Sequence, residues 1–153
     1  MLDIRQDDLR GADVRALLAY HRGSMHAASP PGTVFALDLG GLEARDVTVW
    51  SAWDGTTLAG VAALRQVDHE TGEIKSMRTH PAQLRRGVAA ALLEHLIEQA
   101  RARGWRRLSL ETGSGPAFAA ALALYRRRGF VEGQSFGGYA DSPFNRFLHL
   151  PLA

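Results

Sequence analysis

The stretch Ala82-Gln83-Leu84-Arg85-Arg86-Gly87-Val88-Ala89-Ala90 links a short extended segment to a helix. The extended segment, 74–79, stops at His80-Pro81 because the residue before a proline is pushed toward extended geometry. No bulky side chain follows Arg86, so a pyrophosphate can come close to the backbone. Unpaired N–H groups and the dipole at the start of a helix favour an anion there. The stretch therefore predicts a phosphate-binding loop between a strand and a helix.

The residues before this loop predict a three-stranded antiparallel meander. Val47 to Trp53 is rich in β-branched and aromatic residues, and Asp54-Gly55 is a strong hairpin turn. The chain then runs back over Leu58 to Val67, turns, and enters a third strand from Glu73 to Thr79. Earlier segments predict a first strand at 2–5, a helix at 13–25 and a short helical segment at 39–45.

The residues after the loop alternate between helix and strand. Leucines and an isoleucine between 92 and 97 repeat at three-and-four spacing, and Gly104 stands where a helix C-cap glycine is typical. The elements predicted next are a strand at 107–111, a helix at 117–128 closed by Gly129, and strands at 131–136 and 146–152. The whole pattern predicts one α/β domain (an α+β mixed sheet) over residues 1–153, with a central mixed sheet and helices on both faces.

Two motifs resemble those of the GNAT superfamily of N-acetyltransferases. The family's acyl-coenzyme A signature, Gln/Arg-x-x-Gly-x-Gly/Ala, falls on 84–89, with Leu84 where Gln or Arg is usual. Leu124-Tyr125-x-x-x-Gly129-Phe130 resembles a second motif of the family. The resemblance implies the GNAT fold and an enzyme that uses acetyl-coenzyme A. Ser29-Pro30-Pro31 and the stretch 111–114 are similar to a bacterial subgroup with poorly defined substrates.

The resemblance also implies a binding site for acetyl-coenzyme A as the acyl donor. The loop would hold its phosphates, and Arg85 and Arg86 can supply the positive charge that Leu84 lacks. Backbone amides at the end of the preceding strand would receive the acetyl carbonyl. The residues expected to bind the donor are Met77, Arg78, Thr79, Leu84, Arg85, Arg86, Gly87, Val88, Ala89 and Ala90.

Tyr125 is the candidate proton donor for the leaving group. A phenol with a pKa of about 10 stays protonated at neutral pH and can reprotonate a departing coenzyme A thiolate. The resemblance implies this role for the tyrosine of the second motif. The alternative is a core aromatic side chain whose hydroxyl reaches the surface.

Glu73 is the candidate base that removes a proton from the acceptor amine. Its position resembles one at which GNAT enzymes carry a catalytic glutamate. The alternative is a solvated carboxylate at the start of a strand. His80 and Glu111 lie within reach of the same expected cleft. His80 is more typical of a structural loop histidine, and Glu111 of a salt bridge with an arginine.

The acceptor is predicted to be a primary amine of a small molecule or a peptide. Residues 1–77 hold 7 basic and 11 acidic side chains, whereas residues 78–153 hold 11 and 5. The acidic first half is compatible with a cationic acceptor such as a polyamine. The side chains expected to contact the acceptor are His26, Trp50, Glu111 and Tyr139.

The amino-acid composition excludes several kinds of binding site and partner. The chain has no cysteine, which excludes disulfides, thiolate metal sites and a cysteine nucleophile, and its 6 histidines show no metal-ligand spacing. No apolar run approaches the ~20 residues of a membrane span, and the acidic N-terminus is unlike a signal peptide. We therefore expect a cytoplasmic protein with no metal and no membrane partner.

Other classes of function fit parts of the sequence. A non-catalytic sensor of acyl-coenzyme A would keep the loop but would not need Tyr125. A nucleic-acid-binding domain would explain the arginine excess in 78–153, yet these arginines are not interleaved with stacking aromatic residues, so no nucleic-acid partner is expected. A dinucleotide site is disfavoured because the loop lacks Gly-x-Gly-x-x-Gly. Homodimerisation is an expectation from the family resemblance alone.

Overall fold

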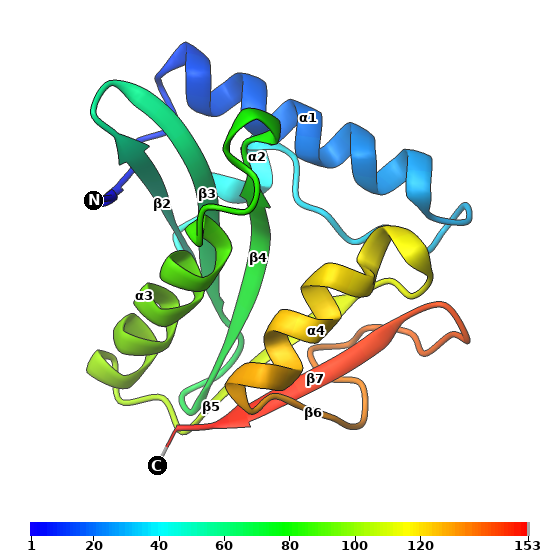
Figure 1. Cartoon of the computed structure of the whole chain (residues 1–153). Coiled ribbons are helices and arrows are strands. Elements are labelled where there is room, and N and C mark those ends of the chain that lie inside the picture. The colour runs from blue at the N-terminus through cyan, green and yellow to red at the C-terminus, as the bar shows by residue number, and fades with distance from the viewer. Residues whose placement is uncertain (153) are drawn as a thin grey trace.

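The computed structural model describes residues 1–152, which form a continuous seven-stranded sheet (Figure 1). The spatial order is β1-β2-β3-β4-β5-β7-β6, in which β4 and β5 are parallel and the other neighbours antiparallel. The strands are β1 Asp3–Gln6, β2 Val47–Asp54, β3 Thr57–Gln66, β4 Thr71–Thr79, β5 Arg107–Thr112, β6 Val131–Glu132 and β7 Arg146–Pro151. The mixed sheet predicted from the sequence is confirmed.

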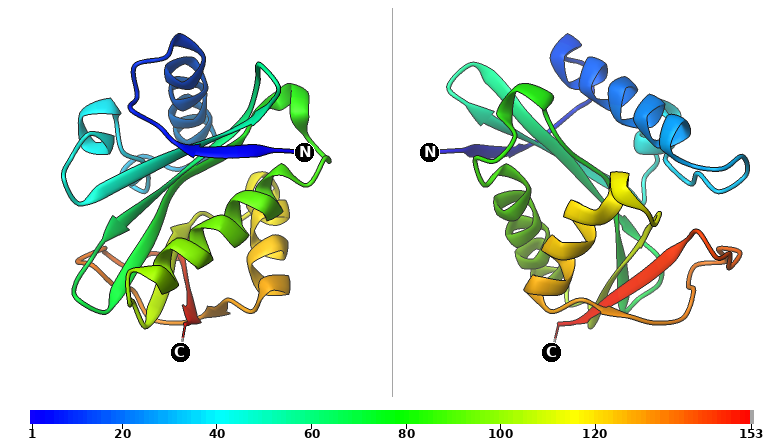
Figure 2. Two further views of the ribbon diagram at one scale, coloured as in Figure 1. Left: turned by 90° about the vertical axis from the view of Figure 1, so that its left-hand side faces the viewer. Right: turned by 45° about the vertical axis from the view of Figure 1, so that its right-hand side comes forward.

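Helices cover both faces of this sheet. α1 (Ala12–Ala28) and the short α2 (Leu39–Leu42) lie on one face, and α3 (Val88–Ala102) and α4 (Ala119–Arg128) lie on the other (Figure 2). Short 3-10 turns, Pro81–Gln83 and Pro116–Phe118, precede α3 and α4. This layered arrangement also confirms the prediction. Across residues 1–152, no helix is both long enough and apolar enough to cross a membrane.

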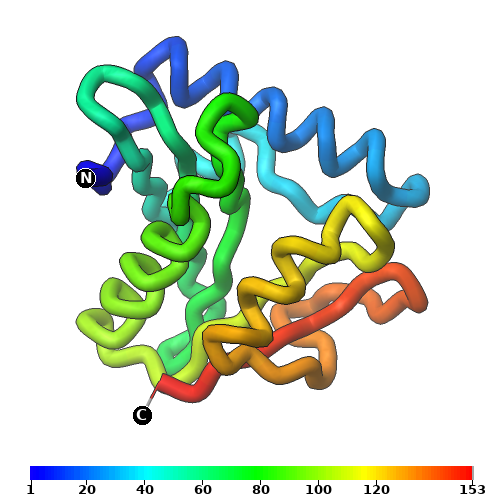
Figure 3. Tube along the Cα trace, in the orientation of Figure 1, coloured from blue at the N-terminus to red at the C-terminus, as the bar shows by residue number. Residues whose placement is uncertain are grey.

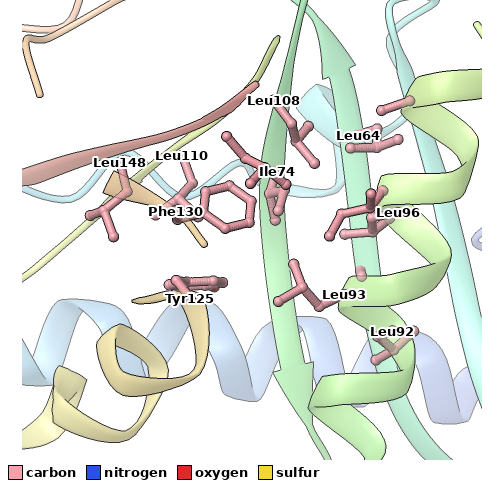
Figure 4. Packing of buried hydrophobic residues seen from close by; sticks show 14 of the residues in the cluster. Leu64, Ile74, Leu92, Leu93, Leu96, Leu108, Leu110, Tyr125, Phe130 and Leu148 are labelled. Atoms are coloured by element: carbon pink, nitrogen blue, oxygen red, sulfur yellow. The ribbon is translucent and has the colours of Figure 1, made fainter. Parts of the chain in front are cut away.

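The central strands β2 and β3 alternate between two apolar clusters, as strands covered on both faces require. On β3, Leu64 belongs to the cluster beneath α3 and α4, whereas its neighbour Ala63 belongs to the cluster beneath α1 and α2. Figure 4 shows the first cluster, in which leucines of α3 face the sheet and Tyr125 and Phe130 lie on the α4 side. The apolar residues at three-and-four spacing in α3 therefore form its buried face.

β4 and β5 pair over part of their length. The paired residues described are Thr71–Ile74 of β4 and Arg107–Leu110 of β5, but β4 continues to Thr79. Further along β4, two residues beginning at Ser76 oppose the single residue Ala62 of β3, and Ser76 has a φ of 54°. This is a β-bulge, which bends the strand that carries it. The two strands consequently diverge beyond their paired part.

Two segments differ from the sequence prediction. The strand expected at 131–136 is limited to Val131–Glu132. Phe136 leaves the sheet because its ring turns inward against Phe147 and His149, at centroid distances of 6.0 and 5.7 Å. The helix expected at 117–128 becomes α-helical only at Ala119, after the 3-10 turn. The other elements lie close to their expected bounds.

A buried histidine ties α1 to β4. His21 is 7% exposed, and its Nδ1 accepts a 2.9 Å hydrogen bond from Nε of Arg78. Burial, aided by the positive charges of Arg78 and Lys75, lowers the pKa of His21 to about 4. The ring is therefore neutral at pH 7, as a hydrogen-bond acceptor at Nδ1 must be.

A Gly72→Ala substitution should destabilise the protein. A Cβ at Gly72 would lie 2.0 Å from Cζ3 of the buried Trp105 ring, which would have to move. Overpacking of this kind costs about 1–3 kcal/mol, measurable by urea unfolding. Gly23→Ala is the control, because a Cβ there would meet nothing within 4 Å inside α1, and it should stabilise by about 1 kcal/mol. Equal unfolding midpoints for the two variants would contradict the described packing.

His21 should make the protein less stable as the pH falls from about 6.5 to about 4. The unfolded chain binds a proton at the ordinary pKa, whereas the folded protein binds it only near pH 4, so acidification favours unfolding by up to about 3 kcal/mol over this window. His21→Asn keeps an acceptor for Arg78 but does not titrate. Urea unfolding at about pH 7 and pH 4.5 should show a smaller acid loss for the variant. The same loss in both proteins would assign the acid sensitivity to other groups.

Candidate active site

The space between the diverging strands is a cavity of about 710 Å³, a volume typical of ligand-binding clefts. Its walls come from several parts of the chain. These are residues 74–79 of β4, residues 110–113 at the end of β5, the start of α3 with the loop before it, one side of α4 with the turn before it, Phe144, the inner side of α1, and the segment 33–36. Figure 3 shows how that last segment returns from the end of α1 toward the sheet.

The loop before α3 is a cradle of backbone N–H groups at one end of the cavity. Gly87 is the N-cap residue, in the left-handed region with a φ of 76°. The first helical hydrogen bond runs from the N–H of Ala91 to the carbonyl of Gly87. Within the described chain, the N–H groups of Val88, Ala89 and Ala90 therefore have no backbone partner. They are donors available to an anion.

The side chains around this cradle suit the phosphates of an acyl-coenzyme A donor. Arg85 lines the cavity with a φ of 64°, and Leu84, which departs from the family pattern, is 59% exposed and lies outside the core. Arg86 does not line the cavity, and its Nη1 donates to Gln83 at 3.3 Å. Of the ten residues expected to bind the donor, those that line the cavity are Met77, Arg78, Thr79, Leu84, Arg85, Gly87, Val88, Ala89 and Ala90.

The end of α4 fixes the ring of Tyr125. The N–H of Phe130 donates to the carbonyl of Tyr125 at 3.0 Å, the N–H of Gly129 donates to the carbonyl of Arg126 at 3.0 Å, and Gly129 has a φ of 108°. This is a Schellman motif, and the Tyr125 and Phe130 rings make its hydrophobic contact at 5.7 Å between centroids (Figure 4). The tyrosine-glycine-phenylalanine spacing of the sequence motif is thus a helix-ending device that places a tyrosine beside the cavity.

The hydroxyl of Tyr125 is available to a bound molecule. Tyr125 is 7% exposed and lines the cavity. No group in residues 1–152 forms a hydrogen bond with its hydroxyl. Burial raises the pKa of Tyr125 to about 12, although the positive charge of Arg78 opposes the shift. The phenol therefore carries its proton at neutral pH.

Glu73 lies behind the cavity wall. Its carboxylate is 0% exposed and accepts a 2.5 Å hydrogen bond from the hydroxyl of Tyr139. Nε of Arg65 lies 3.3 Å from Oε1, and Nζ of Lys75 lies 3.5 Å from Oε2. We call Arg65, Glu73, Lys75 and Tyr139 the buried charge cluster. The expected base is part of this cluster and does not line the cavity.

Glu111 is the carboxylate that lines the cavity among the residues described. Within residues 1–152 it makes no salt bridge with an arginine, contrary to the expectation from sequence. Instead, Nδ2 of the buried Asn145 donates to its Oε2 at 2.7 Å. Burial raises the pKa of Glu111, and the Asn145 hydrogen bond and the charge of Lys75 partly offset that rise. A general base is most effective when its pKa lies near the working pH, so the raised pKa makes Glu111 a better base at neutral pH.

Three residues predicted near the acceptor do not line the cavity. His26 is exposed on α1, and Trp50 is buried in the core, where its ring meets His95. Tyr139 bonds to Glu73 and Lys75 in the buried charge cluster. His80 accepts a 3.1 Å hydrogen bond from the N–H of Ala82, the structural role expected of it.

Lys75 and the segment 33–36 line the cavity without having been predicted. Lys75 donates to the carbonyl of Phe35 at 2.9 Å, so the two are joined directly. The period of two along β4 carries a signal for Lys75, because it shares a face with Glu73. No local pattern marks 33–36, whose place depends on that long-range hydrogen bond.

Comparison with known proteins identifies the family. Residues 14–130 match the acetyltransferase (GNAT) family. The chain is 46% identical over 152 residues to the uncharacterized N-acetyltransferase YedL of Escherichia coli (strain K12), covering 99% of this chain and 96% of the relative. It is also 46% identical over 147 residues to the uncharacterized N-acetyltransferase YsnE of Bacillus subtilis (strain 168), covering 96% and 97%. The poorly characterised bacterial subgroup expected from the sequence is confirmed.

Solved structures of other proteins share the fold of this chain. A Klebsiella pneumoniae protein whose name places it among acyl-CoA N-acyltransferases has a TM-score of 0.84 and 27% identity, covering 100% of this chain and 99% of its own. An Elizabethkingia anophelis GNAT acetyltransferase with acetyl-CoA bound shares the fold at a TM-score of 0.74 and 18% identity, covering 99% and 98%. The cavity and these relatives lead to one conclusion: the chain belongs to the GNAT family and is an acetyl-coenzyme A-dependent N-acetyltransferase.

Proposed function

We propose that the protein transfers the acetyl group of acetyl-coenzyme A directly to a primary amine of a small molecule or a peptide, with both substrates bound at once. One observation carries the proposal: a single cavity is lined by the N–H cradle, Tyr125 and Glu111. These groups match the needs of the reaction, which are binding of the donor, a proton for the leaving group and a base for the amine. The chain has no cysteine that could take the acetyl group first.

The donor is held mainly by backbone. The free N–H groups of Val88 to Ala90 bind phosphate oxygens, and Arg85 and Arg127, which also line the cavity, add positive charge. The backbone of β4 from Met77 to Thr79 receives the acetyl carbonyl. This role is open to it because β4 has left its pairing with β5 beyond Ile74.

Tyr125 donates its proton to sulfur as the carbon–sulfur bond breaks. Its raised pKa keeps the phenol protonated until then, and the nearby charge of Arg78 lowers the cost of the phenolate. In the same step the amine nitrogen forms a bond to the acetyl carbon and gives up a proton. The product is an amide and a free thiol, so atoms and charge balance.

Glu111 receives the proton of the amine. It lines the cavity, whereas Glu73 does not and is separated from it by Lys75, which lies 3.5 Å away. We therefore assign the base role to Glu111. Glu73 has a supporting role, since it balances the charge of Lys75 inside the buried charge cluster.

A cytoplasmic location, a homodimer and independence of metal ions stay predictions from the sequence. Size-exclusion chromatography with light scattering tests the dimer, and activity in the presence of a chelator tests the need for a metal.

Tyr125→Phe should lower kcat by about 10²–10⁴-fold, the usual contribution of a general acid. The Kd for acetyl-coenzyme A should stay the same, because the N–H cradle belongs to a different helix from Tyr125. Thiol release measures kcat, and isothermal titration calorimetry measures the Kd. An unchanged kcat would show that Tyr125 takes no part in the reaction. Loss of acetyl-coenzyme A binding would show that Tyr125 has a structural role.

Glu111→Gln should abolish the rise of kcat/KM with pH on the acid side of the profile. A base works only when unprotonated, so the wild-type rate climbs as the pH passes the raised pKa of Glu111. Glu73→Gln is the comparison and should keep this rise, with its fold checked by thermal melting because the site is buried. If the rise disappears in Glu73→Gln and persists in Glu111→Gln, the base is Glu73.

A further inference from the structure

Arg78 presents a cationic group to the cavity without a carboxylate partner. It lies on β4, lines the cavity and is half-buried. Its Nε donates to His21 at 2.9 Å. Within residues 1–152, no carboxylate lies close enough to pair with it or to shift its pKa. A partly desolvated charge without a counter-charge is costly, which makes Arg78 a binding site for an anion.

The charges around Arg78 are already balanced among themselves. Arg65 and Lys75 lie 3.3 and 3.5 Å from Glu73, and the charge of Lys75 also acts on Glu111. Two cations and two carboxylates therefore compensate one another. Lys75 is further occupied by hydrogen bonds to Tyr139 and Phe35. Arg78 is the surplus positive charge at this end of the cavity.

His21 fixes the direction of the guanidinium. A neutral imidazole can accept at Nδ1, and burial keeps His21 neutral. The guanidinium lies 5.7 Å over the exposed ring of Tyr20, and its Nε bonds to His21. The two Nη groups make no hydrogen bond to the described protein groups and are not buried, so they are open to a bound molecule. These two groups form the fork that binds a carboxylate with two hydrogen bonds. His21 is thus a positioning residue for Arg78.

We propose that the acetyl acceptor is an amino acid with a free carboxylate, which the two Nη groups of Arg78 bind while its amine meets Glu111. This inference rests on the proposed function and specifies its substrate class. Met25, Val34 and Phe35 line the same cavity, so an apolar side chain fits best. The polyamine suggested by the acidic first half of the sequence is disfavoured, because the charge that matters is the local surplus on Arg78.

Matched acceptors test the carboxylate directly. L-leucine, L-methionine and L-phenylalanine are each compared with the corresponding amide, and leucine and phenylalanine also with 3-methylbutylamine and 2-phenylethylamine. The amide has a less basic amine than the amino acid and the decarboxylated compound a more basic one, so the comparison brackets the effect of amine basicity. We expect the highest kcat/KM for the free amino acids.

Arg78→Gln tests the assigned residue. The ratio of kcat/KM for each amino acid to that for its amide should fall about 30-fold or more, the factor expected for loss of a buried charged hydrogen-bond partner. Any general effect on Tyr125 cancels in this ratio. Arg78→Lys should give an intermediate ratio, because it keeps the charge and loses the fork. Arg22→Gln is the control: Arg22 is exposed on α1, next to His21 in the sequence, but does not line the cavity, so the ratio should not change.

His21→Asn and His21→Phe separate positioning from mere packing. The asparagine variant keeps an acceptor for Nε and should retain a low KM for the amino acid. The phenylalanine variant loses the acceptor and should raise that KM with little change in kcat. Equal KM values in the two variants would remove His21 from this role.

Three results would overturn the carboxylate assignment. These are amides or decarboxylated amines used as well as amino acids, a ratio unchanged in Arg78→Gln, and no acetylation of amino acids by protein that acetylates other amines. The proposed function fails separately. It is refuted if the protein does not bind acetyl-coenzyme A in calorimetry or transfers acetyl to no amine of any class.

Discussion

The partial pairing of β4 and β5 is the constraint on which the rest of the site depends. The pairing spans Thr71–Ile74 and Arg107–Leu110, and the bulge at Ser76 then bends β4 away from its neighbour. Backbone groups released from a ladder need other partners. Here they border a cavity into which the N-terminus of α3 also opens. A ligand with both donors and acceptors would complete both sets of hydrogen bonds, which is what the proposed function requires of the donor.

The two ends of the cavity offer different kinds of group to a ligand, backbone N–H groups at one end and charged side chains at the other. Under the proposed function, the donor end would rely on backbone N–H groups, so that the exposed Leu84 side chain would not be needed to bind phosphate. The acceptor end relies on buried or half-buried charges, whose desolvation cost is repaid only by close partners. Lys75 has its partners within the protein, and Arg78 has none among the described carboxylates. Under the proposed function, the first end would therefore hold the donor common to the family, and the second would select the acceptor.

The fold and the donor end could largely be predicted from the sequence, because their signals are local. Strand alternation, the spacing of the α3 leucines and the glycines at 87, 104 and 129 each depend on a few neighbouring residues. The acceptor end could not be predicted as well. Glu73 looks like a strand-end carboxylate until Tyr139, 66 positions away, is seen to cover it. Contacts over such distances depend on sheet register and loop path, which local patterns do not encode.

The segment that departs most from its expected structure is also the one that holds two carboxylates of the sheet in place. Because Phe136 turns inward and the strand ends at Glu132, the chain up to β7 can fold over the sheet. It places Tyr139 on Glu73 and Asn145 on Glu111, and Asn145 also donates to the carbonyl of Thr33 at 3.1 Å. Two loops far apart in sequence are thereby joined across two carboxylates of the sheet. A regular strand at 131–136 would have left both carboxylates without these partners, so the irregularity is what supplies a hydrogen bond to each of them.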